Sequence, residues 1–298
     1  MIPDPTEHAE TYRIYFSEGL AGQVEILNAA ALDESTRAAP WRFDLLLDGK
    51  PHSVVLRLDA RTSEKEYQIL EAVSRFPIPT PAVYGLDREG ETLGEPCFFM
   101  DFIEGEPLLD GLLAGEGWAE DLYIDAVVSL ISPPEELLAV LPEWLEHESA
   151  SDVLEAARQK LKRQSDDLAE RVYHRLHASM PDLPPVQFSN GDLYPANFLV
   201  KDKELVAVID FANASYSDPV FEFLLAFFIH PELCGRGIEE RFCRLVGVDP
   251  TVLPWYHVLE FYDLWGYLAG TEDTFAGYDA ENIRKILAKW NQNGELIR

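Results

Sequence analysis

The residues best suited to chemistry gather in one short stretch of the sequence, from Phe188 to Asp210. Asp192 and Asn197 stand five residues apart there, on a loop bounded by Gly191 and Pro195. Carboxylate and amide oxygens are hard ligands that suit Mg²⁺, an ion that keeps several waters and binds proteins through substrate phosphates. The stretch therefore indicates a metal and phosphate site, provided that the chain brings its polar groups together.

Two apolar runs after this loop predict a β-hairpin. Phe198 to Val200 and Leu205 to Ile209 flank a short polar turn, which is typical of paired strands. Antiparallel pairing brings the outer ends of a hairpin within about 5 Å of each other, so Asn197 and Asp210 are expected to face one point. These two side chains would hold the metal and Asp192 would be left nearby as a base, an arrangement that suits phosphoryl transfer.

The same residues resemble the catalytic core of the aminoglycoside phosphotransferase family, the small-molecule branch of the protein-kinase-like superfamily. Its pattern is roughly H-G-D-x-x-x-x-N, a hairpin, then I-D-[WF]-x-x-[AS]-x-x-x-D-P. Asn190 replaces the usual His, and an Asn side chain can donate and accept similar hydrogen bonds. The resemblance implies an α+β, bilobal protein-kinase-like fold: an N-lobe antiparallel sheet with one helix, and a mostly helical C-lobe with a catalytic loop and hairpin. The matching elements are Asn190-Gly191-Asp192, Asn197, Ile209-Asp210-Phe211-Ala212-Asn213-Ala214 and Asp218-Pro219.

Upstream of this core, the sequence predicts the strands of a kinase N-lobe. Tyr12 to Phe16 is interpreted as β-like and is followed by a small-residue turn with Gly19 and Gly22. A turn of this kind between strands can lay backbone N–H groups over phosphates. Trp41 to Leu47 and Ser53 to Leu58 flank an Asp-Gly turn, which predicts a second hairpin.

A basic residue on the last of these strands has a candidate acidic partner. Family members hold the α- and β-phosphates there with Lys or Arg, and the guanidinium of Arg57 suits a bidentate phosphate contact. A helix is predicted from Ser63 to Ser74, and it carries Glu66 where the family pattern R-E-Y-x-x-L places the Glu that pairs with the strand cation. Ser63 and Glu66 also fit a capping box, and Glu64 is the alternative partner for Arg57.

An apolar run before Glu104 resembles the family's interlobe hinge. Backbone groups of Asp101, Phe102 and Ile103 would contact the adenine of the nucleotide there. The predicted domains are therefore residues 1–103, a nucleotide-binding N-lobe, and residues 104–298, a catalytic and acceptor-binding C-lobe.

Composition restricts the remaining function classes. The net charge of −29 argues against nucleic acid and anionic membranes as partners. The first ten residues lack the basic-then-apolar pattern of a signal peptide, and no apolar run approaches the length of a membrane span. The three cysteines are scattered without metal-ligand spacing, which suggests reduced thiols. We therefore expect a cytoplasmic protein.

Two long segments contain acids but no Lys or Arg. Glu89 to Ala157 holds 18 Asp or Glu residues, and Leu245 to Ile283 holds 7. In related small-molecule kinases the corresponding helices wall the acceptor site. The acids predict either a solvated surface or a cation-attracting pocket. Several aromatic residues either present faces to an amine or fill the core: Trp118, Trp144, Trp255, Tyr256, Tyr262 and Trp265.

Together these patterns predict an ATP- and Mg²⁺-dependent kinase that phosphorylates a hydroxyl of a small molecule, with amine-bearing molecules among the candidates. Its partners would be a nucleotide and that acceptor. Asp192 would take the hydroxyl proton, while Asn197 and Asp210 would hold Mg²⁺ and Arg57 would steady the phosphates. Two alternatives remain: a nucleotide-binding pseudokinase acting as a regulatory or scaffold module, and a protein kinase, against which the lack of a recognisable activation segment counts. Two further acids are expected to brace the catalytic loop or cap the next helix, namely Asp218 and Glu222.

Overall fold

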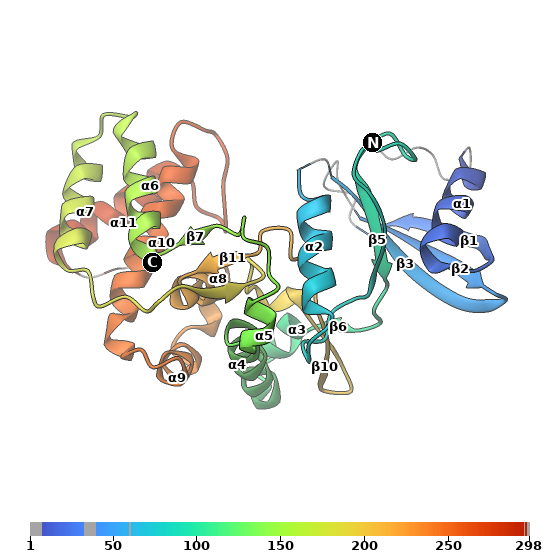
Figure 1. Cartoon of the computed structure of the whole chain (residues 1–298). Helices are drawn as coiled ribbons and strands as arrows, with labels where there is room; N and C mark the ends of the chain where they lie inside the picture. Colours follow the sequence, from blue (N-terminus) through green and yellow to red (C-terminus); the bar gives the residue numbers. More distant parts are fainter. Residues whose placement is uncertain (1–7, 33–39, 60, 295, 297–298) are drawn as a thin grey trace. The chain divides into compact units, whose positions relative to one another are not determined.

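The computed structural model describes residues 8–32, 40–59, 61–294 and 296, a mixed α+β chain (Figure 1). The chain packs into two units, neither of which is continuous in sequence. Two segments that follow residue 108 belong to unit 1 again. The predicted lobe boundary between residues 103 and 104 stays a prediction. Unit 1 contains Met1–Leu108, Pro134–Trp144 and Asn197–Ala214, and unit 2 contains Leu109–Pro133, Leu145–Ala196 and Ser215–Arg298.

A five-stranded antiparallel sheet forms the framework of unit 1, with strand order β1-β2-β3-β5-β4. The predicted hairpin between its second and third strands is confirmed. Asp48 and Gly49 both have positive φ angles, 50° and 79°, which is the backbone of a tight two-residue hairpin turn. The elements of the unit are α1 (Ala9–Leu20), β1 (Val24–Ala31), β2 (Trp41–Leu47), β3 (Lys50–Leu58), α2 (Ser63–Val73), β4 (Val83–Asp87), β5 (Cys97–Asp101), β6 (Glu106–Pro107), α5 (Glu135–Leu138), β9 (Phe198–Lys201) and β10 (Glu204–Val208).

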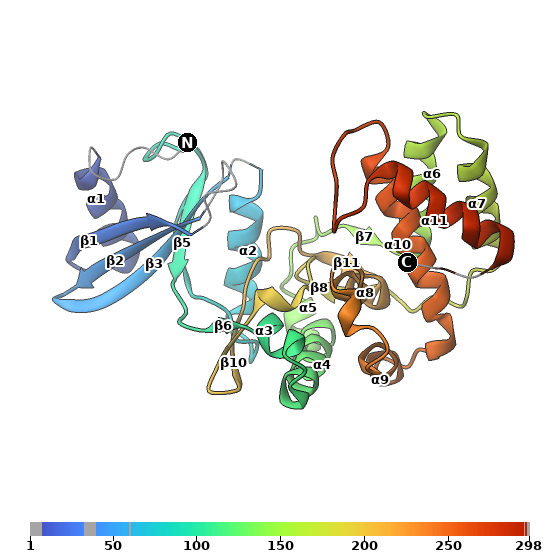
Figure 2. The same ribbon diagram turned by 180° about the vertical axis from the view of Figure 1, so that it is seen from behind.

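Helices α1 and α2 cover opposite faces of this sheet (Figures 1 and 2). Neighbouring residues of a strand point to opposite faces, and β5 shows this directly. Phe98 meets Tyr67 of α2 edge to face, whereas Phe99 meets Phe16 of α1. Strands β3 and β5 are thus buried on both faces, and this packing fixes the positions of these two strands, which line the site described below.

The prediction that Tyr12 to Phe16 is β-like is wrong, because these residues lie in α1. Tyr12, Tyr15 and Phe16 are all buried. Their spacing of i, i+3 and i+4 is that of one helical face, and it places all three rings on the sheet. This periodicity was the signal in the sequence, and the alternation of aromatic and polar residues obscured it.

The hairpin predicted after the loop that carries Asp192 is confirmed as β9–β10. It forms a small sheet of unit 1 with β6, in the order β10-β9-β6. Phe198 pairs with Val208. The N–H of Ile209 donates to the carbonyl of Asn197 at 2.9 Å. The pairing therefore continues one residue beyond the strands and brings the backbone of Asn197 beside the residue before Asp210, as predicted.

Unit 2 is mostly helical and carries one small sheet of strand order β7-β11-β8. Helices α6, α7, α10 and α11 pack side by side (Figure 2), with α10 at the centre against α6, α8 and α11. Among the described residues, no helix is both long and apolar enough to cross a membrane. The elements are α3 (Leu108–Leu113), α4 (Gly117–Ile131), β7 (His147–Glu148), α6 (Ala150–Lys162), α7 (Asp167–Ala178), β8 (Gln187–Ser189), η1 (Pro195–Asn197, at the border with unit 1), β11 (Ser215–Ser217), α8 (Pro219–Ile229), η2 (Pro231–Leu233), α9 (Ile238–Leu245), η3 (Pro250–Val252), α10 (Leu253–Leu268) and α11 (Ala280–Asn293).

Candidate active site

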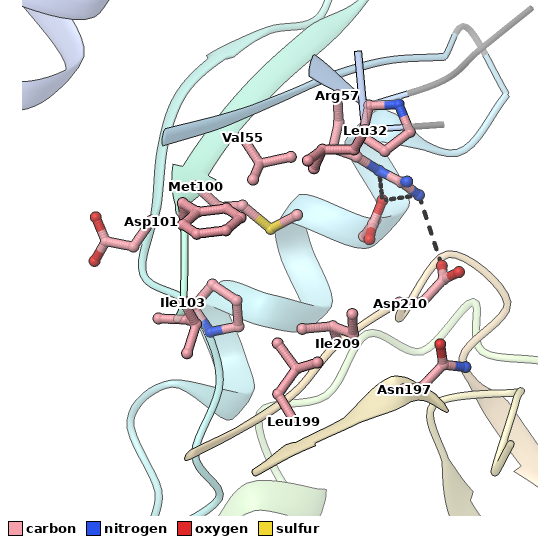
Figure 3. Close-up of a pocket in the computed structure, with 14 residues that line it drawn as sticks. Leu32, Val55, Arg57, Met100, Asp101, Ile103, Asn197, Leu199, Ile209 and Asp210 are labelled. Carbon is pink, nitrogen blue, oxygen red and sulfur yellow. Dashed lines mark hydrogen bonds and ion pairs between the residues drawn. The ribbon is translucent and has the colours of Figure 1, made fainter. Parts of the chain in front are cut away.

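A cavity of about 220 Å³ in unit 1 collects most of the residues predicted to bind nucleotide and metal (Figure 3). One part of its lining is apolar, with Val55 of β3, Met100 of β5, Leu199 of β9 and Ile209 after β10. The predicted hinge residues Asp101, Phe102 and Ile103 line the same part. An apolar cavity edged by backbone polar groups is the usual form of a small-molecule site.

The polar part of the cavity contains an ion-pair cluster centred on Arg57. Its Nε and Nη2 atoms each lie 3.0 Å from Oε2 of Glu66, and Nη2 lies 3.6 Å from Oδ1 of Asp210 (Figure 3). Burial opposes the charge of Arg57, but the two carboxylates outweigh it and raise the pKa of the guanidinium above its ordinary value. One cation thus faces two acids. Burial raises the pKa of Glu66 despite the guanidinium beside it.

The structure also decides between the two interpretations of Glu66. This side chain is 1% exposed and pairs with Arg57. The predicted capping box does not form, because the N-cap of α2 is Thr62 and no side chain caps the helix. The hydroxyl of Ser63 instead accepts from the N–H of Asp59 at 2.9 Å. Breaking a buried ion pair costs about 3 to 5 kcal/mol, so the pair holds α2 to β3.

Asn197 and Asp210 line this cavity together, at the outer end of the β9–β10 hairpin. Asp210 has a φ angle of 59°, a left-handed backbone that residues other than Gly rarely adopt. Strained backbone of this kind costs about 1 to 3 kcal/mol and clusters at ligand-binding sites. The side chain of Asp210 is 42% exposed, so it is accessible to a ligand.

The loop that carries Asp192 belongs to unit 2, and the side chain of Asn190 hydrogen-bonds to its backbone. The Asn190 side chain is fully buried. Its Nδ2 donates to the carbonyl of Asp192 at 2.9 Å, and its Oδ1 accepts from the N–H of Asp192 at 3.4 Å. One amide thus both donates and accepts, at the two polar groups of the Asp192 backbone. That it replaces the hydrogen bonds of the usual His around the metal-binding Asp stays a prediction.

Two residues that the sequence interpretation missed also hold this loop. The hydroxyl of Tyr123 donates to the carbonyl of Leu193 at 2.7 Å, and the hydroxyl of Tyr194 lies 2.6 Å from Nε2 of His230. Tyr123 and His230 are distant from the loop in sequence, so no local pattern could have connected them with it. Together with Asn190, they fix the loop on both sides of Asp192.

Asp218 and Glu222 divide the two predicted supporting roles between them. Asp218 caps α8 by accepting from the N–H groups of Val220 and Phe221 at 2.9 and 3.1 Å. Glu222 accepts a hydrogen bond from Ser189, whose Oγ in turn accepts from the N–H of Gly191 at 3.0 Å. Asp218 therefore caps the following helix and Glu222 braces the catalytic loop.

A second cavity, of about 370 Å³, lies within unit 2 and is acidic. The described residues that line it include five carboxylates and neither Lys nor Arg. Gly191, the neighbour of Asp192, is also part of its wall. Three of the acids come from the two predicted segments without Lys or Arg, so at least these are pocket residues. The five carboxylates are those of Glu148, Asp218, Glu222, Glu260 and Asp263.

The sequence profile of the phosphotransferase enzyme family matches residues 40–251, more than half of the chain. The chain belongs to this family. It is therefore a small-molecule phosphotransferase, and the predicted resemblance and kinase-like fold are confirmed.

Solved structures show the same fold at low sequence identity. Aminoglycoside phosphotransferase APH(4)-Ia is 16% identical with a TM-score of 0.65, over 96% of this chain and 99% of that one. Choline kinase LicA from Streptococcus pneumoniae is 14% identical with a TM-score of 0.57, over 96% and 99%. Macrolide 2′-phosphotransferase MphH from Brachybacterium faecium is 17% identical with a TM-score of 0.52, over 98% and 100%. No curated protein sequence matches the chain.

Two details of this phosphotransferase differ from the sequence interpretation. Gly19 lies in the last turn of α1, where an added Cβ would stand 2.5 Å from the ring of Phe99. An added Cβ at Gly22 would stand 2.6 Å from Leu47. The expected turn between strands is therefore absent at Gly19 and Gly22, and packing explains both glycines. The first two strands are joined after Leu32 instead, through residues 33–39, which lie outside the described part.

For four of the six aromatic residues, the structure confirms core packing, one of the two interpretations that the sequence left open. Four of the proposed rings, Trp255, Tyr256, Tyr262 and Trp265, are buried core residues. None of the six proposed rings is among the described residues of the cavity wall. The rings that do line the cavity come from α8, α10 and the loop after α10, and they are Phe221, Phe228, Tyr267 and Phe275.

Proposed function

We propose that this phosphotransferase uses ATP and Mg²⁺ to phosphorylate a hydroxyl group of an amine-bearing small molecule. The observation that carries the nucleotide half of the proposal is the cluster of Arg57, Glu66 and Asp210 in a cavity that is otherwise apolar. Arg57 is fixed on a strand and donates from a planar fork that matches phosphate oxygens. A bound nucleotide would place its base against the apolar lining and its phosphates near Arg57.

The backbone beside the apolar lining favours adenine as the base. The N–H of Asp101 donates to Ala82 at 3.0 Å, and the N–H of Phe102 donates to Ser53 at 2.9 Å. Alternate residues of an extended chain direct their polar groups to the same side, so the carbonyl of Asp101 and the N–H of Ile103 would share one edge if the chain stays extended after β5. A carbonyl and an N–H on one edge complement the donor N6 and the acceptor N1 of adenine, whereas guanine presents the reverse order.

Asn197 and Asp210 fit Mg²⁺ by the chemistry of their oxygens and by their shared place in the cavity wall. Within the described chain, no three His, Cys, Asp or Glu side chains gather as a metal site. Two protein ligands, with the rest from phosphate and water, are what Mg²⁺ accepts in kinases. The ion would neutralise charge on the phosphate oxygens, while Asp210 releases its contact with Arg57.

Asp192 is the proposed base, on a loop that Asn190 and Tyr123 fix in place. It would orient the acceptor hydroxyl and take its proton as the oxygen attacks phosphorus. Asp192 is separated from Asn197 by only four residues of chain. The catalytic residues therefore follow each other along one loop, although they belong to different packed units.

The acidic cavity supports an acceptor that carries an amine or quaternary nitrogen. A cation among five carboxylates and four aromatic rings gains from Coulomb attraction and from cation–π contacts. APH(4)-Ia has been solved as a ternary complex with ADP and hygromycin B, and LicA is a choline kinase. Both share the fold of this chain, which supports testing amino alcohols and aminoglycosides first.

The test is to incubate the protein with Mg²⁺ and ATP in the presence of pooled amino alcohols, aminoglycosides, macrolides and sugars, and to read product masses. A phosphorylated amine that the Asp192→Asn variant does not produce would support the whole proposal. If only neutral acceptors are phosphorylated, the part of the proposal that names an amine-bearing acceptor is wrong. If no pool gives a product and the affinity for ATP is the same with and without Mg²⁺, the pseudokinase alternative is favoured.

A further inference from the structure

Glu222 belongs to two structures at once, the acidic cavity and the support of the catalytic loop. It lines the cavity of unit 2 and is only partly accessible. Its carboxylate also accepts the hydroxyl of Ser189, and the same Ser189 oxygen accepts the N–H of Gly191. Gly191 immediately precedes Asp192, so a single chain of two hydrogen bonds connects a cavity acid with the proposed base.

This chain of hydrogen bonds depends on the charge of Glu222. Ser189 has one hydroxyl proton, which it donates to Oε2 of Glu222. A protonated carboxyl keeps an oxygen that can accept this proton, but that acceptor is neutral. An ionised acceptor roughly doubles the strength of such a bond. When the acid is protonated, its own O–H competes for the Ser189 oxygen, which Gly191 already uses. Ionised Glu222 therefore holds the loop more firmly than protonated Glu222.

The surroundings of Glu222 oppose its ionisation. Burial, together with the carboxylates of Asp192 and Asp218, raises the pKa of its carboxyl from 4.5 to about 7, and the hydroxyls of Ser189 and Ser217 oppose this rise. Burial also raises the pKa of Glu148 and Asp263 across the cavity, whose wall includes Glu260 as well. On the Asp263 side the facing cation is Lys160, whose Nζ is 3.9 Å from Oδ1 of Asp263.

We infer that Glu222 is a positioning residue through which a cationic acceptor tightens the catalytic loop. A cation that enters the cavity favours the ionised carboxylate, the proton leaves to solvent, and Ser189 then holds Gly191 and Asp192 in one arrangement. A neutral acceptor of the same shape does not expel the proton. This inference rests on the proposed amine acceptor and adds a consequence, namely that acceptor binding releases a proton near neutral pH.

Proton release is measured by calorimetric titration at pH 7 in two buffers of different ionisation enthalpy. The probe is whichever of choline, ethanolamine and hygromycin B is phosphorylated fastest, with the nucleotide analogue AMP-PNP present. For choline, 3,3-dimethylbutan-1-ol is the neutral isostere. Wild type should release up to about half a proton with the amine, because a group with a pKa of about 7 is half protonated at pH 7.

Two variants separate the charge of Glu222 from its hydrogen bond. Glu222→Gln keeps the size and an oxygen that accepts from Ser189 but has no proton to release, so the release should fall to near zero. Its kcat/KM for the amine should lose its pH dependence around pH 7. Glu222→Asp keeps the charge but is one methylene shorter, so it should still release a proton while kcat falls. Glu281→Gln removes an exposed carboxylate on α11 and serves as the matched control.

The outcomes distinguish this inference from the proposed function. If only neutral acceptors are phosphorylated, the amine part of the proposed function is wrong and the inference is overturned with it. If an amine is phosphorylated but Glu222→Gln releases as many protons as wild type, the inference alone is overturned. Loss of release in Glu222→Gln, with release retained in Glu222→Asp and Glu281→Gln, supports it.

Discussion

The two cavities differ in the cations that their acids face. In unit 1, Glu66 and Asp210 lie 3.0 and 3.6 Å from the guanidinium of Arg57. In unit 2, five carboxylates share a wall that has no Lys or Arg among its described residues. The first cavity thus carries its own cation and presents it to an anionic ligand. The second has no cation among the described residues of its wall, and burial raises the pKa of four of its acids, Glu148, Asp218, Glu222 and Asp263. A cationic ligand would reduce this cost.

The largest effect that would test this comparison is expected in unit 1. Asp210→Ala should abolish the Mg²⁺-dependent tightening of ATP binding, measured by calorimetry with and without the metal. Turnover should fall by about a thousandfold or more, since metal stabilisation of developing charge is worth several kcal/mol. Asn197→Ala should act in the same direction but less severely, because it removes a neutral ligand.

Loss of Asp210 also frees one of the two carboxylates beside Arg57. ATP binding in the absence of metal should therefore be unchanged or slightly tighter in Asp210→Ala, which separates a metal defect from a folding defect. If the variant keeps the metal dependence of wild type, the metal does not bind at this hairpin, and the interpretation of the cavity as a nucleotide and metal site loses its support.

The second effect concerns Asp192, on the unit 2 side of the same loop. Asp192→Asn should lower kcat by at least about a hundredfold, the usual scale for a general base. The affinity for Mg²⁺ and ATP should remain close to that of wild type, because the nucleotide cavity is lined by unit 1 residues. Normal turnover of any true substrate by this variant would show that another group takes the proton.

The sequence predicted the loop and hairpin of the site well because their information is local. Asp192, Asn197 and Asp210 are separated by short intervals, and strand pairing alone brings Asn197 beside the residue before Asp210. Glu66 was placed by the order of elements, and the structure chose its ion pair over the capping box. Where a few closely spaced residues and one turn form the candidate site, the sequence is sufficient to predict their placement, and their roles stay predictions.

The sequence was less informative where the partners are distant. The wall of the acidic cavity combines α8, α10 and β7, so no single segment shows which acids converge or which aromatic rings face them. The α1 prediction failed for a different reason: the strand propensity of the aromatic residues outweighed their helical spacing in the interpretation, although Tyr12, Tyr15 and Phe16 pack on the sheet as one helical face. Tertiary contacts override such propensities.

The third effect asks whether the charge of the acidic cavity selects the substrate. A matched pair of acceptors, an amine and its neutral isostere, should differ in kcat/KM by roughly a hundredfold at low ionic strength, because a desolvated charge pair is worth a few kcal/mol. Selectivity that comes from the cavity should largely survive added salt. Attraction from exposed acids would be screened over about 8 to 10 Å.

The same comparison at high ionic strength separates the two sources of selectivity. Discrimination that disappears with salt belongs to the exposed acids of the surface and acts on the association rate. Equal kcat/KM for both acceptors at low salt would show that neither the cavity nor the surface recognises an amine, and the contrast between the two cavities would then say nothing about the substrate.

A smaller effect is expected at Asn190. Asn190→Ala removes both hydrogen bonds to the backbone of Asp192 and should reduce kcat about tenfold, near 1.4 kcal/mol, with little change in nucleotide affinity. Asn190→His introduces the residue usual in the family and should recover much of the loss. Equal turnover in wild type and Asn190→Ala would mean that Tyr123 and Tyr194 hold the loop without it.

The smallest expected effect is the pH dependence of stability that Glu222 contributes. Its pKa is raised from the ordinary value of 4.5 to about 7 in the fold, so the folded state keeps a proton that the unfolded chain loses. The contribution is fully present below about pH 4.5 and is lost as the pH rises to about 7. Glu222→Gln resembles the protonated form. The free energy of unfolding by urea should therefore be higher in Glu222→Gln than in wild type, and this difference should be about 1 kcal/mol larger at pH 8 than at pH 4.5. The figure is reduced because the carboxyl is partly accessible to solvent. A difference between the two proteins that stays constant over this range would show that Glu222 is ionised throughout, and that the fold does not raise its pKa.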